Sequence, residues 1–339
     1  MPEPTRDATR LEAQSPPAGG DGEKKPQEAR PTAVPAPAVP EAKPTQYRAS
    51  LFQGPQKVLP PAFVSLVQQL EEALGMPVWL LSHCFDNKCG NLDDQMVLAF
   101  FGARDEMEPG KPVALLIDSA GGYARSAYQL AMLFRKHCGE FVAVVPRYAK
   151  SAATLLALGA RDILLGQYGE LGPLDAQVED PESEVMYSAL DEVQTLERLH
   201  AFALEAVDKS MFFMMGRVGK KVQTMLPMMM GFASDIVTPL MEKIDAIHYT
   251  QMSRVLKEAE EYASRLLRLH HPAEEAAGIA RRLVEGYPEH GFVIDYEEAK
   301  QMRMHVRKLS KEVAPLLDRM VPFLPSMTAV GHLREATEQ

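Results

Sequence analysis

The sequence has few cysteines and no excess of positive charge. Its 339 residues include only three cysteines, Cys84, Cys89 and Cys138, too few and too scattered for a disulfide framework. Lys and Arg number 36 against 46 Asp and Glu, the formal net charge is −10, and no long basic cluster occurs. We therefore expect a reducing compartment and no nucleic-acid partner.

Long apolar runs are also missing. The first residues, MPEPTRDATRLEAQ, contain no apolar stretch of the kind that a secretory signal needs. The most apolar segment, residues 211–232, is interrupted by Arg217, Lys220, Lys221 and Pro227, too many breaks for a membrane-spanning helix. The sequence predicts a cytoplasmic protein without a transmembrane segment.

Residues 1–47 are rich in Pro, Ala, Glu and Gln and contain ten of the 26 prolines. Such a segment buries too little apolar surface to offset its ordering entropy, so it is predicted to be a disordered tail. We expect one folded domain over residues 48–310 and a C-terminal extension over residues 311–339.

Strand and helix patterns alternate after this tail. Apolar runs predict strands at 76–82, 113–117, 141–145 and 163–165, and helices are expected from Asp93–Asp94, over 123–138 and over 151–159. The buried stripe of the second helix is expected to contain Tyr123, Ala127, Leu130, Ala131 and Phe134. This order is typical of a mixed α/β core, in which ligands bind near the carboxyl ends of the strands.

Residues 190–269 are predicted to be mostly helical. They contain a methionine cluster: Met211, Met214, Met215, Met225, Met228, Met229 and Met230. Adaptable core packing explains such a cluster, and a protein-binding groove is the alternative. A further apolar face over residues 239–268 suits packing either on the protein's own core or on a neighbouring subunit.

Two strand-to-helix turns carry the candidate chemistry, residues 118–122 and 146–151. Ser151 opens a helix of small residues, where a serine acts as a plain N-cap or as a nucleophile. A nucleophile there would use the helix N-terminus and the Ala152 amide to stabilise an oxyanion. Gly121 and Gly122 allow close backbone approach and free amides, although a tight turn or a phosphate loop would also use them. A right-handed crossover would place the two turns side by side.

The runs LLIDSAGGYARSAYQLAMLFRK and VAVVPRYAKSAATLLALGARDILLGQYGELGPLDAQ resemble the serine dehydrogenase proteinase family. This family is a branch of the ClpP and crotonase superfamily related to signal peptide peptidase A. The resemblance is dense from Val113 to Gln177 and looser from Val78 to about Asp295. It implies a ClpP/crotonase-like fold of repeated β-β-α units with additional C-terminal helices, usually in a homo-oligomer.

The resemblance also implies roles for individual residues. It places the nucleophile on Ser151 and the oxyanion donors on the amides of Gly122 and Ala152, while Gly121 shapes the turn. Substrate is expected to bind as an extended strand beside the segment from Gly122 through Tyr123 to Ala124, main chain to main chain.

The general base stays open. Clp proteases carry a histidine in the segment that corresponds to residues 166–175, and this chain has none there, whereas signal peptide peptidases use a lysine. The candidates are Lys150, His290 and Lys209. Lys150 adjoins Ser151, but neighbouring side chains at a helix start diverge by roughly 100°, which favours a rim charge. His290 lies in a loop and Lys209 on a helix, where ordinary solvated roles are the alternative, and Asp175 would orient a base or cap a turn.

Three functions compete on these residues. The first is a serine peptidase that acts on peptides or proteins through a Ser151 acyl-enzyme. The second is a crotonase-like enzyme of acyl thioesters, which would not need Ser151, and the third is a non-catalytic oligomeric scaffold. We expect neither cofactor nor metal, because nucleotide motifs are absent and the pair Cys84 and Cys89 next to His83 lacks a second pair for zinc.

Overall fold

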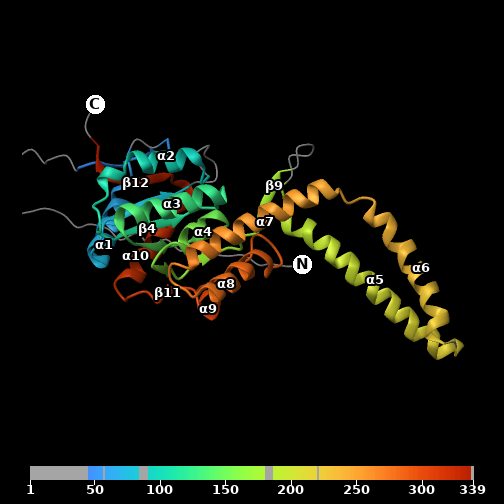
Figure 1. Ribbon diagram of the computed structural model, residues 1–339. Helices are drawn as coiled ribbons and strands as arrows, with labels where there is room; N and C mark the ends of the chain where they lie inside the picture. Colours follow the sequence, from blue (N-terminus) through green and yellow to red (C-terminus); the bar gives the residue numbers. More distant parts are fainter. Residues whose placement is uncertain (1–44, 56–57, 84–90, 180–185, 220, 337–339) are drawn as a thin grey trace, which may run out of the picture. The chain divides into compact units, whose positions relative to one another are not determined.

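The computed structural model describes residues 45–55, 58–83, 91–179, 186–219 and 221–336 (Figure 1). The predicted tail, apart from residues 45–47, lies outside these ranges, as do Cys84 and Cys89. Within them, no helix is both long enough and apolar enough to cross a membrane.

An eight-stranded sheet forms the centre of the fold. Its strand order is β1-β12-β3-β4-β5-β7-β11, and β2 pairs with β12. The strands are β1 (Tyr47–Ala49), β2 (Phe52–Gln53), β3 (Val78–Ser82), β4 (Val113–Asp118), β5 (Phe141–Val145), β7 (Asp162–Leu165), β11 (Val306–Arg307) and β12 (Ala329–Glu335). Strands β3, β4, β5, β7 and β11 are parallel, while β12 is antiparallel to β3. The four strands predicted from apolar runs are confirmed.

Helices cover both faces of this sheet because side chains alternate along each buried strand. Trp79 and Leu81 of β3 belong to the core on one face, and Leu80 to the core on the other. The first face is covered by α2 (Asp94–Gly102), α3 (Ala124–Cys138), α4 (Ala152–Leu158), α7 (Ala246–Leu267) and α8 (Ala273–Glu285). The second face is covered by α1 (Pro61–Leu74), α10 (Val313–Met320) and the short helix η2 (Val321–Ser326). The mixed α/β architecture is therefore confirmed.

A second, smaller layer follows the carboxyl ends of three strands. After β5 comes β6 (Tyr148–Ala149), and after β7 comes β8 (Glu170–Leu171), which pairs with β6 in parallel. After β4, Ser119 pairs with Ala149 in the same way. Main strand, second-layer segment and helix thus recur, which is the repeated β-β-α unit that the resemblance implied.

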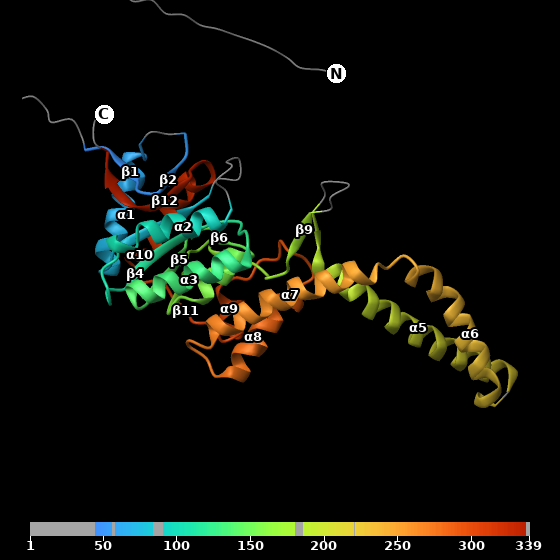
Figure 2. The same ribbon diagram turned by 45° about the horizontal axis from the view of Figure 1, so that its top comes forward.

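The described chain continues into a helical hairpin. Helices α5 (Ala189–Val218) and α6 (Val222–Met241) lie side by side, and α7 returns to the sheet (Figures 1 and 2). A small ribbon of β9 (Gln177–Glu179) and β10 (Met186–Ser188) precedes α5. The remaining elements are the short helices η1 (Arg104–Glu106) and α9 (Tyr296–Gln301).

Three details differ from the sequence-based expectations. Tyr123 was expected on the buried stripe of α3 but precedes the helix and is 68% exposed. The apolar face over residues 239–268 is divided between two helices, because the Asp245 side chain caps a new helix at Ala246. Within α7 itself, Ile247 is 72% exposed, while Leu266 is fully buried. Finally, β12 falls in the expected C-terminal extension, yet it lies inside the sheet between β1 and β3.

Candidate active site

The two turns after β4 and β5 lie against each other. The Ser119 amide donates to the Tyr148 carbonyl at 3.2 Å, and the Lys150 amide donates to the Ser119 carbonyl at 3.0 Å. A Cβ placed on Gly121 would lie 3.0 Å from the Ser151 Cβ and 2.7 Å from the Lys150 carbonyl oxygen. The crossover therefore brings the diglycine and Ser151 together, and only glycine fits at position 121.

Ser151 adopts a backbone conformation that is unusual for any residue except glycine. Its φ is 49° and its ψ is −122°, and its side chain makes no hydrogen bond to the amides of α4. A non-glycine residue in such a region costs on the order of 1–3 kcal/mol. The structure therefore does not support the interpretation of Ser151 as a plain N-cap. Ser151 is half-buried, and its hydroxyl does not bond the amides at the start of α4.

The amides around Ser151 divide into used and unused donors. The Gly121 amide donates to the Ser119 hydroxyl at 3.2 Å, and the Tyr123 amide donates to the Leu92 carbonyl at 2.8 Å. Within the described ranges, the amides of Gly122 and Ala152 have no acceptor. Two unpaired backbone donors near one hydroxyl can stabilise an oxyanion that develops beside them.

Leu92 occupies one side of the diglycine segment. Its amide donates to the Gly121 carbonyl at 2.8 Å, and a Cβ on Gly122 would lie 2.4 Å from its carbonyl oxygen. Successive amides of an extended chain point to opposite sides, so the Gly122 amide faces away from Leu92. A peptide could pair only on the side that Leu92 leaves open. This long-range pairing had no signal in the sequence.

An ion pair that the sequence analysis missed supports both turns. The guanidinium of Arg147 binds the fully buried Asp118 carboxylate through two bonds of 2.9 and 2.7 Å. Burial raises the pKa of Asp118, and the bonds from Arg147 oppose that rise. Because Asp118 ends β4 and Arg147 begins the next turn, the pair fixes the spacing of the two loops. A carboxylate at the end of an apolar strand was the available signal.

His83, at the end of β3, is a second residue that the sequence analysis did not place here. Its Nδ1 lies 3.0 Å from the Ser119 hydroxyl, which also accepts from the Gly121 amide. Its Nε2 is buried without a partner in the described part of the chain. Burial lowers the pKa of His83 to about 4, against an opposing influence of Asp93. The imidazole is therefore neutral near pH 7. It supports the diglycine turn indirectly, because it bonds the Ser119 hydroxyl that accepts from the Gly121 amide.

Two of the candidate bases are engaged elsewhere. The Lys150 ammonium lies 2.8 Å from a Glu170 carboxylate oxygen and donates to the carbonyls of Leu171 and Phe292 at 3.3 and 3.1 Å. These contacts use its donors and tie the Ser151 turn to a late loop. Lys209 pairs with Glu205 on α5 at 2.5 Å and is otherwise exposed.

Asp175 and His290 influence each other electrostatically. Burial raises the pKa of the Asp175 carboxyl, and a hydrogen bond from the Ser188 side chain and, to a smaller extent, the electrostatic influence of His290 oppose that rise. Asp175 also accepts from the Leu190 amide at 3.3 Å, so it bonds the first turn of α5. The Nδ1 of His290 is buried and has no partner among the described residues. The loop of His290 is anchored where Ile294 pairs with Leu171, beside the carbonyls that bind Lys150.

Comparison with known protein families finds a match to one part of the chain. The model of the ClpP-like SDH-type serine proteinases matches residues 94–225, which include both turns. The family resemblance is confirmed.

Two uncharacterized proteins of Methanocaldococcus jannaschii are similar to the chain. MJ0137 is 26% identical over 209 residues, 61% of this chain and 58% of that protein. MJ1495 is 25% identical over 208 residues, 61% of this chain and 56% of that protein. The matches thus span less than two thirds of the length of these relatives.

Solved structures of two proteases are also similar at low identity. One is a mutant of the membrane-bound stomatin-specific protease 1510-N, with 12% identity, a TM-score of 0.39 and coverage of 76% of this chain and 93% of that one. The other is ClpP1 from Listeria monocytogenes, with 10% identity, a TM-score of 0.33 and coverage of 72% and 98%.

The segment that the family model matches contains most of the predicted site but not all of it. Ser151, Asp175 and Lys209 lie within residues 94–225, whereas His290 lies beyond them.

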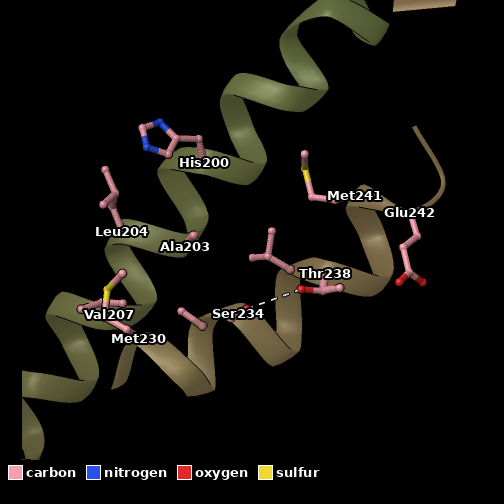
Figure 3. Close-up of a pocket in the computed structure, with 11 residues that line it drawn as sticks. His200, Ala203, Leu204, Val207, Met230, Ser234, Thr238, Met241 and Glu242 are labelled. Carbon is pink, nitrogen blue, oxygen red and sulfur yellow. Dashed lines mark hydrogen bonds between the residues drawn. The ribbon is translucent and has the colours of Figure 1, made fainter. Parts of the chain in front are cut away.

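An apolar pocket of about 530 Å³ between α5 and α6 contains none of these predicted site residues (Figure 3). Its lining includes His200, Leu204, Val207, Met230 and Met241. In the described ranges, no group of three His, Cys, Asp or Glu side chains could hold a metal ion.

Proposed function

We propose that the protein is a serine peptidase whose nucleophile is Ser151. The Ser151 oxygen attacks a peptide carbonyl, the hydroxyl proton passes to a base, and the amides of Gly122 and Ala152 hold the oxyanion. The amine then leaves with a proton, and water releases the acyl group. The observation that carries this proposal is the strained Ser151 backbone, which keeps its hydroxyl off the helix and beside two unpaired amides.

His290 is our proposed base, and Asp175 is the residue that orients it. Three observations support this pair: the interaction of the two side chains, the buried unpartnered Nδ1, and the anchoring of the His290 loop against the Ser151 turn through Lys150. Lys150 is assigned a positioning role, because its ammonium already has three acceptors. A neutral histidine accepts the serine proton in the attack and returns it to the leaving amine.

The proposed substrate is an extended segment of a peptide or protein. It would pair with the main chain at Gly122, on the side that Leu92 does not occupy. The few cysteines and the family resemblance further support action in the cytoplasm as a homo-oligomer.

Hydrolysis of a fluorogenic peptide library tests this function. Ser151→Ala should lower kcat/KM by about 10³-fold or more, and His290→Ala by about 10²–10⁴-fold. Ser264→Ala is the matched control, since that buried hydroxyl has no partner among the described residues and lies on α7. No peptide cleavage by the wild type, together with acyl-CoA hydrolysis that Ser151→Ala retains in full, would contradict the peptidase and favour the thioester enzyme.

A further inference from the structure

The end of the α5–α6 hairpin exposes large apolar side chains. We define the hairpin tip as residues 212–219 and 221–228, the last turns of α5 and the first turns of α6. Phe212 is 85% exposed and Phe213 is 54% exposed, and Leu226 and Met228 are also exposed. Phe212 and Phe213 are neighbours on a helix, so their side chains point about 100° apart and give the tip a broad apolar surface. Exposed apolar patches of this kind mark interaction surfaces.

The charge around the hairpin tip is opposite to that of the whole chain. Residues 209–234 contain no Asp or Glu, but they contain four basic residues, Lys209, Arg217, Lys220 and Lys221, in a chain of net charge −10. The Arg217 guanidinium lies 4.2 Å from the centre of the Phe213 ring. Across the ranges that the structure describes, neither Arg217 nor Lys221 has an ion-pair partner. The tip thus presents aromatic rings and unpaired cations together.

We propose that the hairpin tip docks on the surface of a bilayer that contains anionic lipids. Phe212, Phe213 and Met228 would enter the headgroup region, while Arg217 and Lys221 would bind lipid phosphates. Charge complementarity favours this occupant over a second copy of the chain. A symmetric contact between two tips would bring their basic side chains together. The tip lies on the surface of the bilayer and does not cross it, because charges and Pro227 interrupt the segment.

Co-sedimentation with vesicles tests the docking on the full-length chain. The expected result is binding to vesicles of three parts phosphatidylcholine to one part phosphatidylserine, weak binding to phosphatidylcholine alone, and release at high salt. Arg217→Glu with Lys221→Glu should weaken binding on the order of thirtyfold or more, and Phe212→Ser with Phe213→Ser should also weaken it.

Matched controls separate the tip from the rest of the protein. Arg268→Glu changes an exposed arginine at the end of α7, and Leu98→Ser changes an exposed apolar residue on α2. Both should bind vesicles like the wild type, as should Ser151→Ala, since the inference does not depend on the proposed peptidase. Equal vesicle binding by the tip variants and the wild type would overturn the proposal. The proposal would also be overturned if the wild type did not bind vesicles and the tip variants changed only the oligomeric state measured by sedimentation velocity.

Discussion

At the residue scale, the site depends on a strained serine. Position 151 has the positive φ that glycine adopts without cost, and the side chain makes no capping hydrogen bond to α4 that would offset the strain. Stability and chemistry therefore have opposite requirements at this position.

Substitutions at Ser151 should reveal this conflict. We predict that Ser151→Gly is more stable than Ser151→Ala by about 1 kcal/mol, because alanine retains the strain and glycine relieves it. Urea unfolding followed by the fluorescence of Trp79, the chain's one tryptophan, measures the difference. Both variants should lack peptidase activity. A less stable glycine variant would show that the observed backbone conformation is not strained.

His83 predicts a dependence of stability on pH. Its pKa is about 4 in the folded chain against an ordinary 6.5, so the folded state binds fewer protons between these values. The free energy of unfolding should therefore fall by about 3 kcal/mol as the pH decreases from 6.5 to 4. The His83→Asn variant keeps a polar group near Ser119 but does not titrate. The difference in stability between wild type and His83→Asn should shrink across this window, and a difference that does not vary with pH would contradict the neutral, buried imidazole.

At the element scale, the diglycine turn is held between two segments that leave no room for a side chain. Gly121 abuts the Ser151 turn, and Gly122 abuts the backbone of Leu92. The turn thereby connects the end of β4 to both the nucleophile and the edge where substrate is proposed to pair.

A Cβ at position 122 should disrupt this arrangement. Gly122→Ala would place the Cβ 2.4 Å from the Leu92 carbonyl oxygen at a φ of +150°, so we predict lost stability and lost activity together. Gly278→Ala in α8 is the control, because nothing lies within 4 Å of its added Cβ. That control should gain about 0.5–1 kcal/mol, since alanine favours helix over glycine. Thermal melts measure the stability of both variants, and peptide hydrolysis measures their activity. A fully active Gly122→Ala would contradict the close approach of Leu92.

The sequence predicted these elements where local patterns decide the structure. Apolar runs located β3, β4, β5 and β7, and the helix expected over residues 123–138 ends at Cys138 as α3 does. Turn residues with small side chains located Ser151 and the diglycine. Contacts made across the chain, such as Leu92 with Gly122 and Lys150 with Phe292, leave no periodic signal and were missed. The roles of Ser151, Gly122, His290 and Asp175 remain predictions.

At the scale of the whole molecule, the last strand is part of the central sheet. β12 lies between β1 and β3 and pairs with both, so the two ends of the described chain are joined in one sheet. The sequence analysis expected a C-terminal extension over residues 311–339 and no strand there. A strand whose partners lie about 250 residues away is specified by tertiary packing, which local propensity does not report.

Truncation should show how much the fold depends on β12. A chain ending at Thr328 loses the strand and exposes both β1 and β3, so we predict no cooperative unfolding transition. A chain ending at Ala336 keeps β12 and the bond from the Ala336 amide to the Gln46 carbonyl, and it should unfold like the full chain. Urea titrations monitored by Trp79 fluorescence compare the two. A cooperative transition in the shorter chain would refute an integral role for β12.

The position of a covalent adduct tests the central claim most directly. After reaction with a fluorophosphonate, peptide mapping by mass spectrometry should find one stoichiometric adduct on Ser151, and none on Ser151→Ala. Modification of Ser264→Ala should equal that of the wild type. An adduct on another serine, or equal labelling of wild type and Ser151→Ala, would contradict the assignment of Ser151 as the nucleophile.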